Sequence, residues 1–139
     1  MNAKAFLDTN VFIYFYSDNE LSKRTAAHQA LDSYTCITSI QAMNEACNVW
    51  YKKFRWGGEK IKEHLSNIEL VCDDVVSIQK ATIMKAISLK ERYGYSYYDC
   101  LMLASALEGN CEVIFTEDMS DNQIIEDRLQ IINPFKKQQ

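Results

Sequence analysis

Hydrophobic and polar positions along the chain alternate between two kinds of segment. Short, mostly apolar runs are typical of strands that are buried on both faces of a parallel sheet. Longer runs carry apolar residues three or four positions apart, as amphipathic helices do. The pattern predicts strands at residues 3–7, 36–39, 69–72, 112–115 and 129–132. It predicts helices at residues 11–16, 22–33, 40–54, 60–67, 75–93 and 99–108.

Individual residues mark several ends of these predicted helices. Ser22 is expected to cap the second helix. Gly57 and Gly58 are expected to end the third, and Gly94 to end the fifth. Strands that alternate with helices indicate an α/β sandwich, in which helices cover both faces of a parallel sheet. Ligands of such folds bind beyond the carboxyl ends of the strands.

Length and composition indicate one ordinary globular domain. The 139 residues are near the common size of a single domain, so residues 1–139 are expected to form one unit with a flexible tail at 136–139. The N-terminus lacks the basic and apolar regions of a secretory signal. No segment approaches the roughly 20 apolar residues that span a bilayer. A cytoplasmic protein without membrane contact is therefore expected.

Cysteines and histidines give little support to a disulfide framework or a zinc site. The five cysteines are scattered and odd in number, so they are expected to be buried, reduced thiols. Neither His28 nor His64 has a Cys or His partner three or four residues further on. A zinc site is therefore disfavoured.

The charge of the chain is unevenly distributed. A net charge of -4 argues against a general surface for polyanions, because non-specific affinity for nucleic acids depends on Lys and Arg. The segment YKKFRWGGEKIK is a local exception, with Lys52, Lys53 and Arg55 interleaved with aromatic residues. Such a mixture is suited to phosphate contact and base stacking, and it is equally typical of a solvated helix end.

Two acidic residues follow predicted strands directly. Asp8 comes after the first strand in FLDTN, and Asp118 comes after the fourth in VIFTED. Asp, Thr and Asn are also good helix caps, so Asp8 has two interpretations. It can open the next helix, or it can be a ligand held at the end of a strand.

Two more acidic residues lie on predicted helices. Glu45 is in the third helix, roughly opposite the apolar stripe of that helix, where a carboxylate by itself indicates only a solvated face. Asp99 lies three residues after Ser96, which is the spacing of a capping box at a helix start. Each position has an ordinary structural explanation when it is considered alone.

A common chemistry is the reason to group these four carboxylates. Hydrolysis of a phosphodiester without a nucleophilic side chain requires divalent cations, and Mg²⁺ and Mn²⁺ prefer oxygen ligands. Crowded carboxylates repel one another until a cation binds. Thr9, Asn10 and Thr116 lie next to this group in the sequence and can orient its ligands.

The acidic positions and the motifs around them resemble the PIN-domain nucleases, and most of all the VapC-like toxins of bacterial toxin–antitoxin pairs. The resemblance covers Phe6 to Phe135 and depends on four motifs in order along the chain. They are FLDTN, TSIQAMNEA with Ser39 and Glu45, YSYYDCLMLASA with Asp99, and FTEDM with Thr116 and Asp118.

The resemblance implies a three-layer α/β/α sandwich around a short parallel sheet and an Mg²⁺- or Mn²⁺-dependent endoribonuclease. It also implies a homodimer and a cognate antitoxin as partners. Its acidic site matches Asp8, Glu45, Asp99 and Asp118, with polar support from Thr9, Asn10, Ser39 and Thr116 and an outer carboxylate at Asp121. Glu117 is expected to diverge from Asp118 and to lie outside the site.

Three other functions were weighed on the sequence. A receiver-type signalling domain would use Asp73 and Asp74 after the strand at 69–72, but the Lys expected after a late strand is absent. A phosphatase with an aspartyl intermediate would need a second Asp where Asn10 stands. A PIN-like binding module without catalysis remains open, although all four acidic positions are present.

Overall fold

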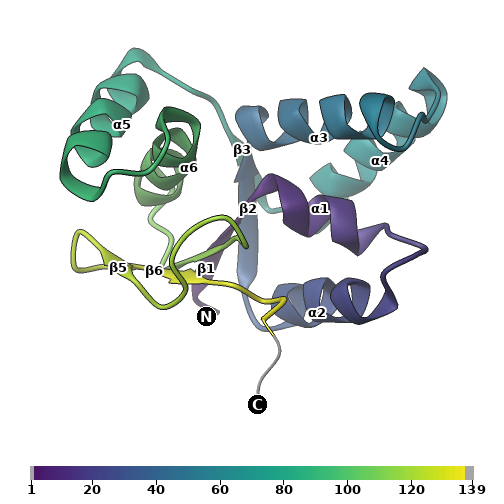
Figure 1. The fold of residues 1–139 in the computed structure, drawn as a ribbon, viewed down its shortest axis with the longest axis horizontal. Helices are drawn as coiled ribbons and strands as arrows, with labels where there is room; N and C mark the ends of the chain where they lie inside the picture. The colour runs from purple at the N-terminus through teal and green to yellow at the C-terminus, as the bar shows by residue number, and fades with distance from the viewer. Residues whose placement is uncertain (1, 137–139) are drawn as a thin grey trace.

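A six-stranded sheet forms the centre of the computed structural model, which describes residues 2–136 (Figure 1). The strand order is β3-β2-β1-β4-β6-β5, and among these strands only β5 runs antiparallel to its neighbour. The strands are β1 (Lys4–Leu7), β2 (Thr35–Ser39), β3 (Asp74–Val76), β4 (Val113–Phe115), β5 (Ile124–Ile125) and β6 (Leu129–Ile132).

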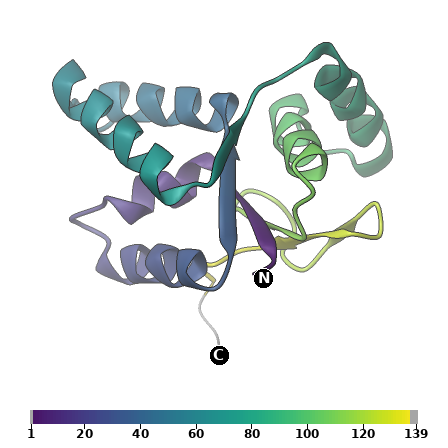
Figure 2. The same ribbon diagram turned by 180° about the vertical axis from the view of Figure 1, so that it is seen from behind.

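Helices cover both faces of the sheet, as Figure 2 shows from behind. The first four lie on one face and the last two on the other (Figure 1). This arrangement confirms the three-layer α/β/α sandwich. The helices are α1 (Thr9–Phe15), α2 (Leu21–Asp32), α3 (Ile40–Lys52), α4 (Gly58–Val71), α5 (Lys80–Tyr93) and α6 (Tyr97–Glu108).

The core lies on both sides of β1 and around α6. Ala5, Phe6 and Leu7 of β1 are completely buried, because the strand lies between β2 and β4 and has helices on both faces. Every residue of α6 from Cys100 to Leu107 is buried as well. A helix that is buried on all sides cannot be amphipathic, and accordingly this segment reads as almost continuously apolar.

The predicted strand at 69–72 is wrong. Residues 58–71 continue as α4, because Ile61 and Ile68 recur at helical spacing and are buried. The strand begins only at Asp74, and its β-branched residues Val75 and Val76 were assigned to a helix that in fact begins at Lys80.

Several predicted helix ends also need correction. The cap of α2 is Glu20 rather than Ser22, and it makes no side-chain capping bond. α3 ends at Lys52, so Gly57 and Gly58 begin α4 instead of ending α3. Gly94 ends α5 as predicted, with a left-handed φ of 79°. The short strand β5 was not predicted, because a two-residue strand has too few positions to show a period.

Other expectations have mixed outcomes. All five cysteines are free, and Cys47 is half-buried whereas the other four are buried.

No helix in the described part of the chain has the length and apolar character needed to cross a membrane. The expected tail at 136–139 lies outside the described residues except for Lys136.

Candidate active site

The ends of β1 and β4 place Asp8 beside Thr116. Leu7 pairs with Phe115 in the parallel ladder, so the next residue of each strand leaves the sheet at the same edge. The strand order reverses at β1, with β2 on one side and β4 on the other, and this is where ligands bind in open α/β sheets. Asp8 is 4% exposed.

Hydrogen bonds fix the carboxylate of Asp8. Its Oδ1 accepts from the backbone N–H of Thr9 at 2.7 Å, and its Oδ2 accepts from the hydroxyl of Thr116 at 2.6 Å. The bond to Thr9 makes Asp8 the N-cap of α1. Both interpretations of Asp8 are therefore compatible, since each carboxylate oxygen keeps a second lone pair for a ligand.

Carboxylates from three other segments reach the same cleft. Glu45 comes from α3, Asp99 from the first turn of α6, and Asp118 from the loop after β4. The cleft has a volume of about 200 Å³. It is lined by Asp8, Thr9, Asn10, Glu45, Val49, Tyr98, Asp99, Met102 and Asp118.

The predicted polar residues bind these carboxylates. The hydroxyl of Thr9 donates to Glu45 Oε2 at 3.4 Å, and Asn10 Nδ2 donates to Asp118 Oδ2 at 3.2 Å. Thr116 also accepts from the backbone N–H of Asp118 at 3.2 Å through its hydroxyl oxygen. Such contacts fix the orientation of the carboxylates before any ligand arrives.

Asp99 is only partly explained by helix capping. The hydroxyl oxygen of Ser96 accepts from the backbone N–H of Asp99 at 3.2 Å, as in a capping box. Within the described residues, the Asp99 carboxylate does not accept the reciprocal bond from the backbone N–H of Ser96. The carboxylate therefore remains available to the cleft, where the dipole of α6 favours its negative charge.

Repulsion and burial raise the pKa values in the cleft. Burial, together with the charges of Asp118 and Glu45, raises the pKa of Asp8 to about 6 despite the two hydrogen bonds that lower it. Burial and the charge of Asp99 also raise the pKa of both Glu45 and Asp118. The cleft therefore holds negative charge at a free-energy cost, which a bound cation would reduce.

The donor set fits a hard divalent cation. All the candidate ligand atoms are oxygens, as Mg²⁺ and Mn²⁺ require, and burial together with repulsion raises the pKa of both Asp8 and Asp118. In residues 2–136, no three His, Cys, Asp or Glu side chains already stand in an arrangement that encloses an ion. Asp8, Asp99 and Asp118, with Glu45 beside them, are the residues that would hold it.

Comparison of the sequence with protein-family profiles shows the family of this chain. The sequence profile of the PIN domain matches residues 5–120, a range that contains all four carboxylates. The chain belongs to the PIN-domain family. A search of curated proteins found no match.

Solved structures share the fold of this PIN domain. A toxin–antitoxin complex from Klebsiella pneumoniae has a TM-score of 0.71 at 21% identity, over 94% of this chain and 97% of that chain. VapC20 of Mycobacterium tuberculosis, a toxin that cleaves the sarcin–ricin loop, has a TM-score of 0.64 at 16% identity, over 82% and 89%. The FitAcB complex from Neisseria gonorrhoeae has a TM-score of 0.64 at 18% identity, over 94% and 98%.

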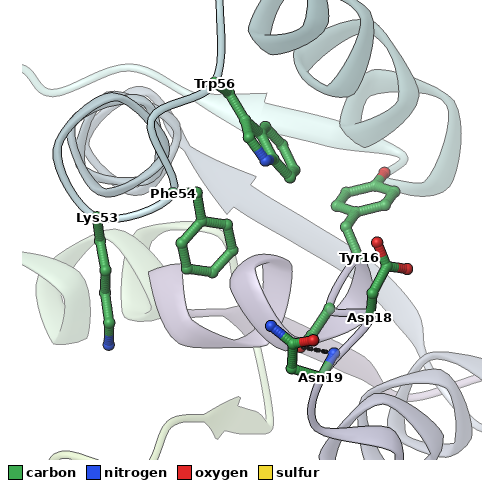
Figure 3. Close-up of a pocket in the computed structure, with 7 residues that line it drawn as sticks. Tyr16, Asp18, Asn19, Lys53, Phe54 and Trp56 are labelled. Atoms are coloured by element: carbon green, nitrogen blue, oxygen red, sulfur yellow. Dashed lines mark hydrogen bonds between the residues drawn. The ribbon is translucent and has the colours of Figure 1, made fainter.

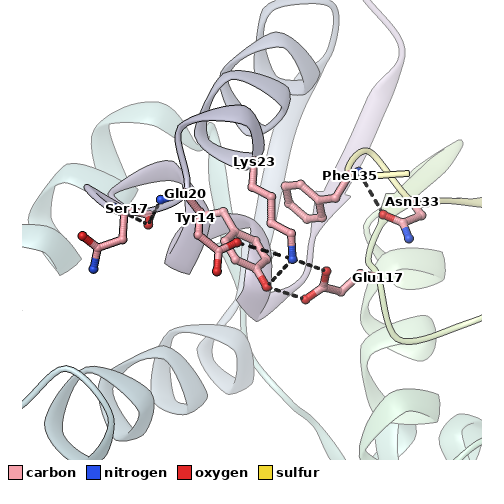
Figure 4. Close-up of polar contacts among 8 residues, drawn as sticks. Tyr14, Ser17, Glu20, Lys23, Glu117, Asn133 and Phe135 are labelled. Carbon is pink, nitrogen blue, oxygen red and sulfur yellow. Dashed lines mark hydrogen bonds and ion pairs between the residues drawn. The ribbon is translucent and has the colours of Figure 1, made fainter. Parts of the chain in front are cut away.

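Sequence reasoning missed an anchor for the loop of this PIN domain that carries Asp118. Glu117 turns away from the cleft and accepts a hydrogen bond from the hydroxyl of Tyr14 at 3.0 Å (Figure 4). Lys23 Nζ donates to the same hydroxyl at 2.9 Å and lies 3.6 Å from Glu117 Oε2. Tyr14 and Lys23 belong to an ordinary amphipathic pattern, so nothing in the sequence indicated that they meet Glu117.

The remaining candidate residues lie outside the cleft. Ser39 is buried and caps α3 by accepting from the backbone N–H of Ala42 at 3.1 Å. Asp121 accepts from the backbone N–H of Asn133 at 2.8 Å and so fixes the C-terminal segment. Lys52, Lys53 and Arg55 are exposed at the far end of α3.

Asp73 and Asp74 do not form a receiver site. Asp73 precedes β3 and Asp74 is its first residue, so both lie at the amino end of that strand, whereas the cleft lies beyond the carboxyl ends of β1 and β4. The match to the PIN domain is also at odds with a receiver-type signalling domain.

Proposed function

We propose that this PIN domain is a metal-dependent endoribonuclease that hydrolyses phosphodiester bonds of RNA, and that it is the toxin of a toxin–antitoxin pair. The main support is the convergence of Asp8, Glu45, Asp99 and Asp118 from four separate segments in one cleft. The solved structures with the same fold include a toxin–antitoxin complex and a toxin that cleaves the sarcin–ricin loop. A cytoplasmic homodimer that a cognate antitoxin silences is the corresponding biological form.

In this mechanism, Asp8, Asp99 and Asp118 would hold Mg²⁺ or Mn²⁺. The bound cation would supply positive charge against the phosphate and would acidify water. Thr116 holds Asp8 in place and Asn10 holds Asp118, which keeps the ligand oxygens directed into the cleft. Glu45 orients the attacking water and accepts its proton. Its raised pKa makes it a better proton acceptor than an ordinary surface glutamate.

Cleavage assays on wild type and Asp99→Asn test this proposal. Purified proteins are incubated with structured and single-stranded RNAs in Mn²⁺, Mg²⁺ or EDTA. We expect cleavage that requires metal and falls by at least ~10³-fold in Asp99→Asn, because one metal-holding charge is removed. Asp73→Asn is the matched control, since its exposed carboxylate lies at the amino end of β3, away from the cleft, and it should cleave at close to the wild-type rate.

Two outcomes would contradict the proposal. Equal cleavage by wild type and Asp99→Asn would mean that another site, or a contaminating nuclease, produces the fragments. Absence of cleavage by every variant, together with no calorimetric heat of Mn²⁺ binding, would identify the chain as a binding module without catalysis.

A further inference from the structure

A second cavity lies at the opposite end of α1 and α3, the helices that carry Thr9, Asn10 and Glu45 of the cleft. It has a volume of about 430 Å³ and lies between the loop after α1 and the loop after α3 (Figure 3). α1 carries Thr9 and Asn10 at its start, and Tyr16 follows its end. The cavity is lined by Tyr16, Ser17, Asp18, Asn19, Lys53, Phe54 and Trp56.

The spacing of the two sites follows from helix geometry. α3 carries Glu45 near the cleft and ends just before Lys53 at the cavity. At a rise of ~1.5 Å per residue, this separation is about 12 Å along α3, and the corresponding distance along α1 is about 10 Å. A stacked nucleic-acid strand rises ~3.4 Å per nucleotide, so the two sites are about three nucleotides apart.

Aromatic rings form the walls of the cavity. Tyr16, Phe54 and Trp56 surround the open space in Figure 3. Trp56 stacks on the fully buried Trp50 with ring centroids 5.2 Å apart and an interplanar angle of 15°. Phe54 packs edge-on against Trp56 at 5.6 Å. Because the core holds these rings in place, a planar ligand would lose little free energy in ordering them.

Positive charge lies beside the same cavity, which Lys53 lines and which Lys52 and Arg55 adjoin in the sequence. Lys52, Lys53 and Arg55 are exposed, and within residues 2–136 none of them has a carboxylate at ion-pair distance. Asp18, the acidic residue of the cavity wall, forms an ion pair with Arg24, in which Oδ1 lies 3.8 Å from Nη1. These cations can attract phosphates that the carboxylate cleft by itself would repel.

We propose that this cavity is a nucleobase-binding subsite for single-stranded RNA. A base enters among Tyr16, Phe54 and Trp56, while Lys52 and Lys53 contact the neighbouring phosphates, and the strand continues along α1 and α3 to the carboxylates. Proteins bind single-stranded nucleic acids through planar rings that stack on bases and cations that contact phosphates. An apolar peptide in the same cavity would not need the cations. The inference rests on the proposed ribonuclease function.

The test measures binding separately from cleavage. The Asp99→Asn protein, in EDTA, is titrated with fluorescently labelled single-stranded RNA octamers, and affinity is read from anisotropy. Adding Phe54→Ala should weaken binding about 10-fold, because loss of one base–aromatic stack costs ~1–3 kcal/mol. Adding Leu70→Ala is the control. Leu70 is an exposed apolar residue on α4 that lies outside the basic segment and does not line the cavity, and its loss should change affinity less than 2-fold.

Phe54→Leu distinguishes stacking from folding. It retains apolar volume and removes the planar ring, so thermal unfolding should stay near that of the parent protein while RNA affinity falls. Equal affinities for the Phe54→Leu, Leu70→Ala and parent proteins would overturn the subsite. The cavity would then be a candidate site for a protein partner instead of a nucleobase.

The two proposals fail in different ways. Metal-dependent cleavage by the wild type, with no effect of Phe54 substitutions on RNA affinity, would overturn the subsite alone. Loss of RNA affinity in the Phe54 variants, with no cleavage by the wild type in any metal, would overturn the nuclease proposal and leave the RNA-binding site supported.

Discussion

The two ends of the α1–α3 pair are chemically opposite. At the start of the helices, four carboxylates share a cleft of about 200 Å³, and the buried Asp8 has a pKa of about 6. At the far end, Trp50 is fully buried, contacts Trp56, Tyr16 and His64, and is followed by exposed cations. One end opposes folding through repulsion and desolvation, whereas the other favours it through packing.

This contrast shows how the fold tolerates a costly site. Like charges in a partly buried cleft lower the free energy of unfolding in the absence of metal. Packing in other parts of the helical layer on the same face of the sheet must therefore offset this loss of stability. The aromatic cluster lies at the far end of α1 and α3, the helices that carry Thr9, Asn10 and Glu45 of the cleft. Its packing can therefore hold α1 and α3 in place although the carboxylates at the cleft end repel one another.

The largest effect on stability is expected at the aromatic end. Trp50→Ala should lower the free energy of unfolding by about 3–5 kcal/mol, because it removes a fully buried ring and leaves a cavity. Urea denaturation followed by circular dichroism measures this change. Leu70→Ala is the control, since Leu70 is 84% exposed on α4 and should cost less than about 0.5 kcal/mol. Similar losses in the two variants would refute the stabilising role of the aromatic cluster.

An effect of opposite sign is expected at the acidic end. In metal-free protein at pH 8, Asp8→Asn should raise the free energy of unfolding by about 1–3 kcal/mol, since the ionised carboxylate is buried and repelled. The folded pKa of about 6 exceeds the ordinary value of 3.8, so wild type gains stability as the pH falls from 6 toward 4. The advantage of the variant should therefore disappear near pH 4.

Urea denaturation at pH 8, 6 and 4 in EDTA checks this prediction. Saturating Mn²⁺ should stabilise wild type and have a smaller effect on Asp8→Asn. A variant that is less stable than wild type at pH 8 would show that the hydrogen bonds from Thr9 and Thr116 outweigh repulsion.

The smallest effect is expected at the anchor between the two ends. Tyr14→Phe removes a hydroxyl that bonds Glu117 and Lys23, and should lower the free energy of unfolding by about 1 kcal/mol. Because Glu117 precedes Asp118, a looser loop should also reduce cleavage several-fold. Tyr34→Phe is the matched control, since the described residues give its hydroxyl no hydrogen-bond partner and its ring packs on Phe115. Unchanged cleavage by Tyr14→Phe would show that the hydrogen bond between Tyr14 and Glu117 is not needed for the activity of the site.

Sequence patterns predicted the elements that have one clear period. The strand at 129–132 coincides with β6, and the end of α5 at Gly94 follows from its freedom to adopt a left-handed φ. The strand at 69–72 failed because Glu69 to Cys72 is apolar enough for either structure, and only the packing of Ile61 and Ile68 keeps it helical.

The candidate site shows the same division. The motifs FLDTN and FTEDM identified Asp8, Thr116 and Asp118, because parallel strands end at one edge of a sheet. Glu45 was assigned to a position opposite the apolar stripe, yet it is half-buried beside Ala46, because α3 packs against α1. Asp121 and Ser39 have the right residue types, but they are used for other hydrogen bonds.

By itself, the sequence determined the alternation of strands and helices, the parallel sheet and the acidic residues at strand ends, because these depend on local period and residue type. Only the tertiary structure decided which carboxylates share a cleft, that Glu117 turns toward Lys23, and that Tyr16, Phe54 and Trp56 surround one cavity. These relations join residues far apart in the chain, and their geometry is set by how the helices pack on the sheet.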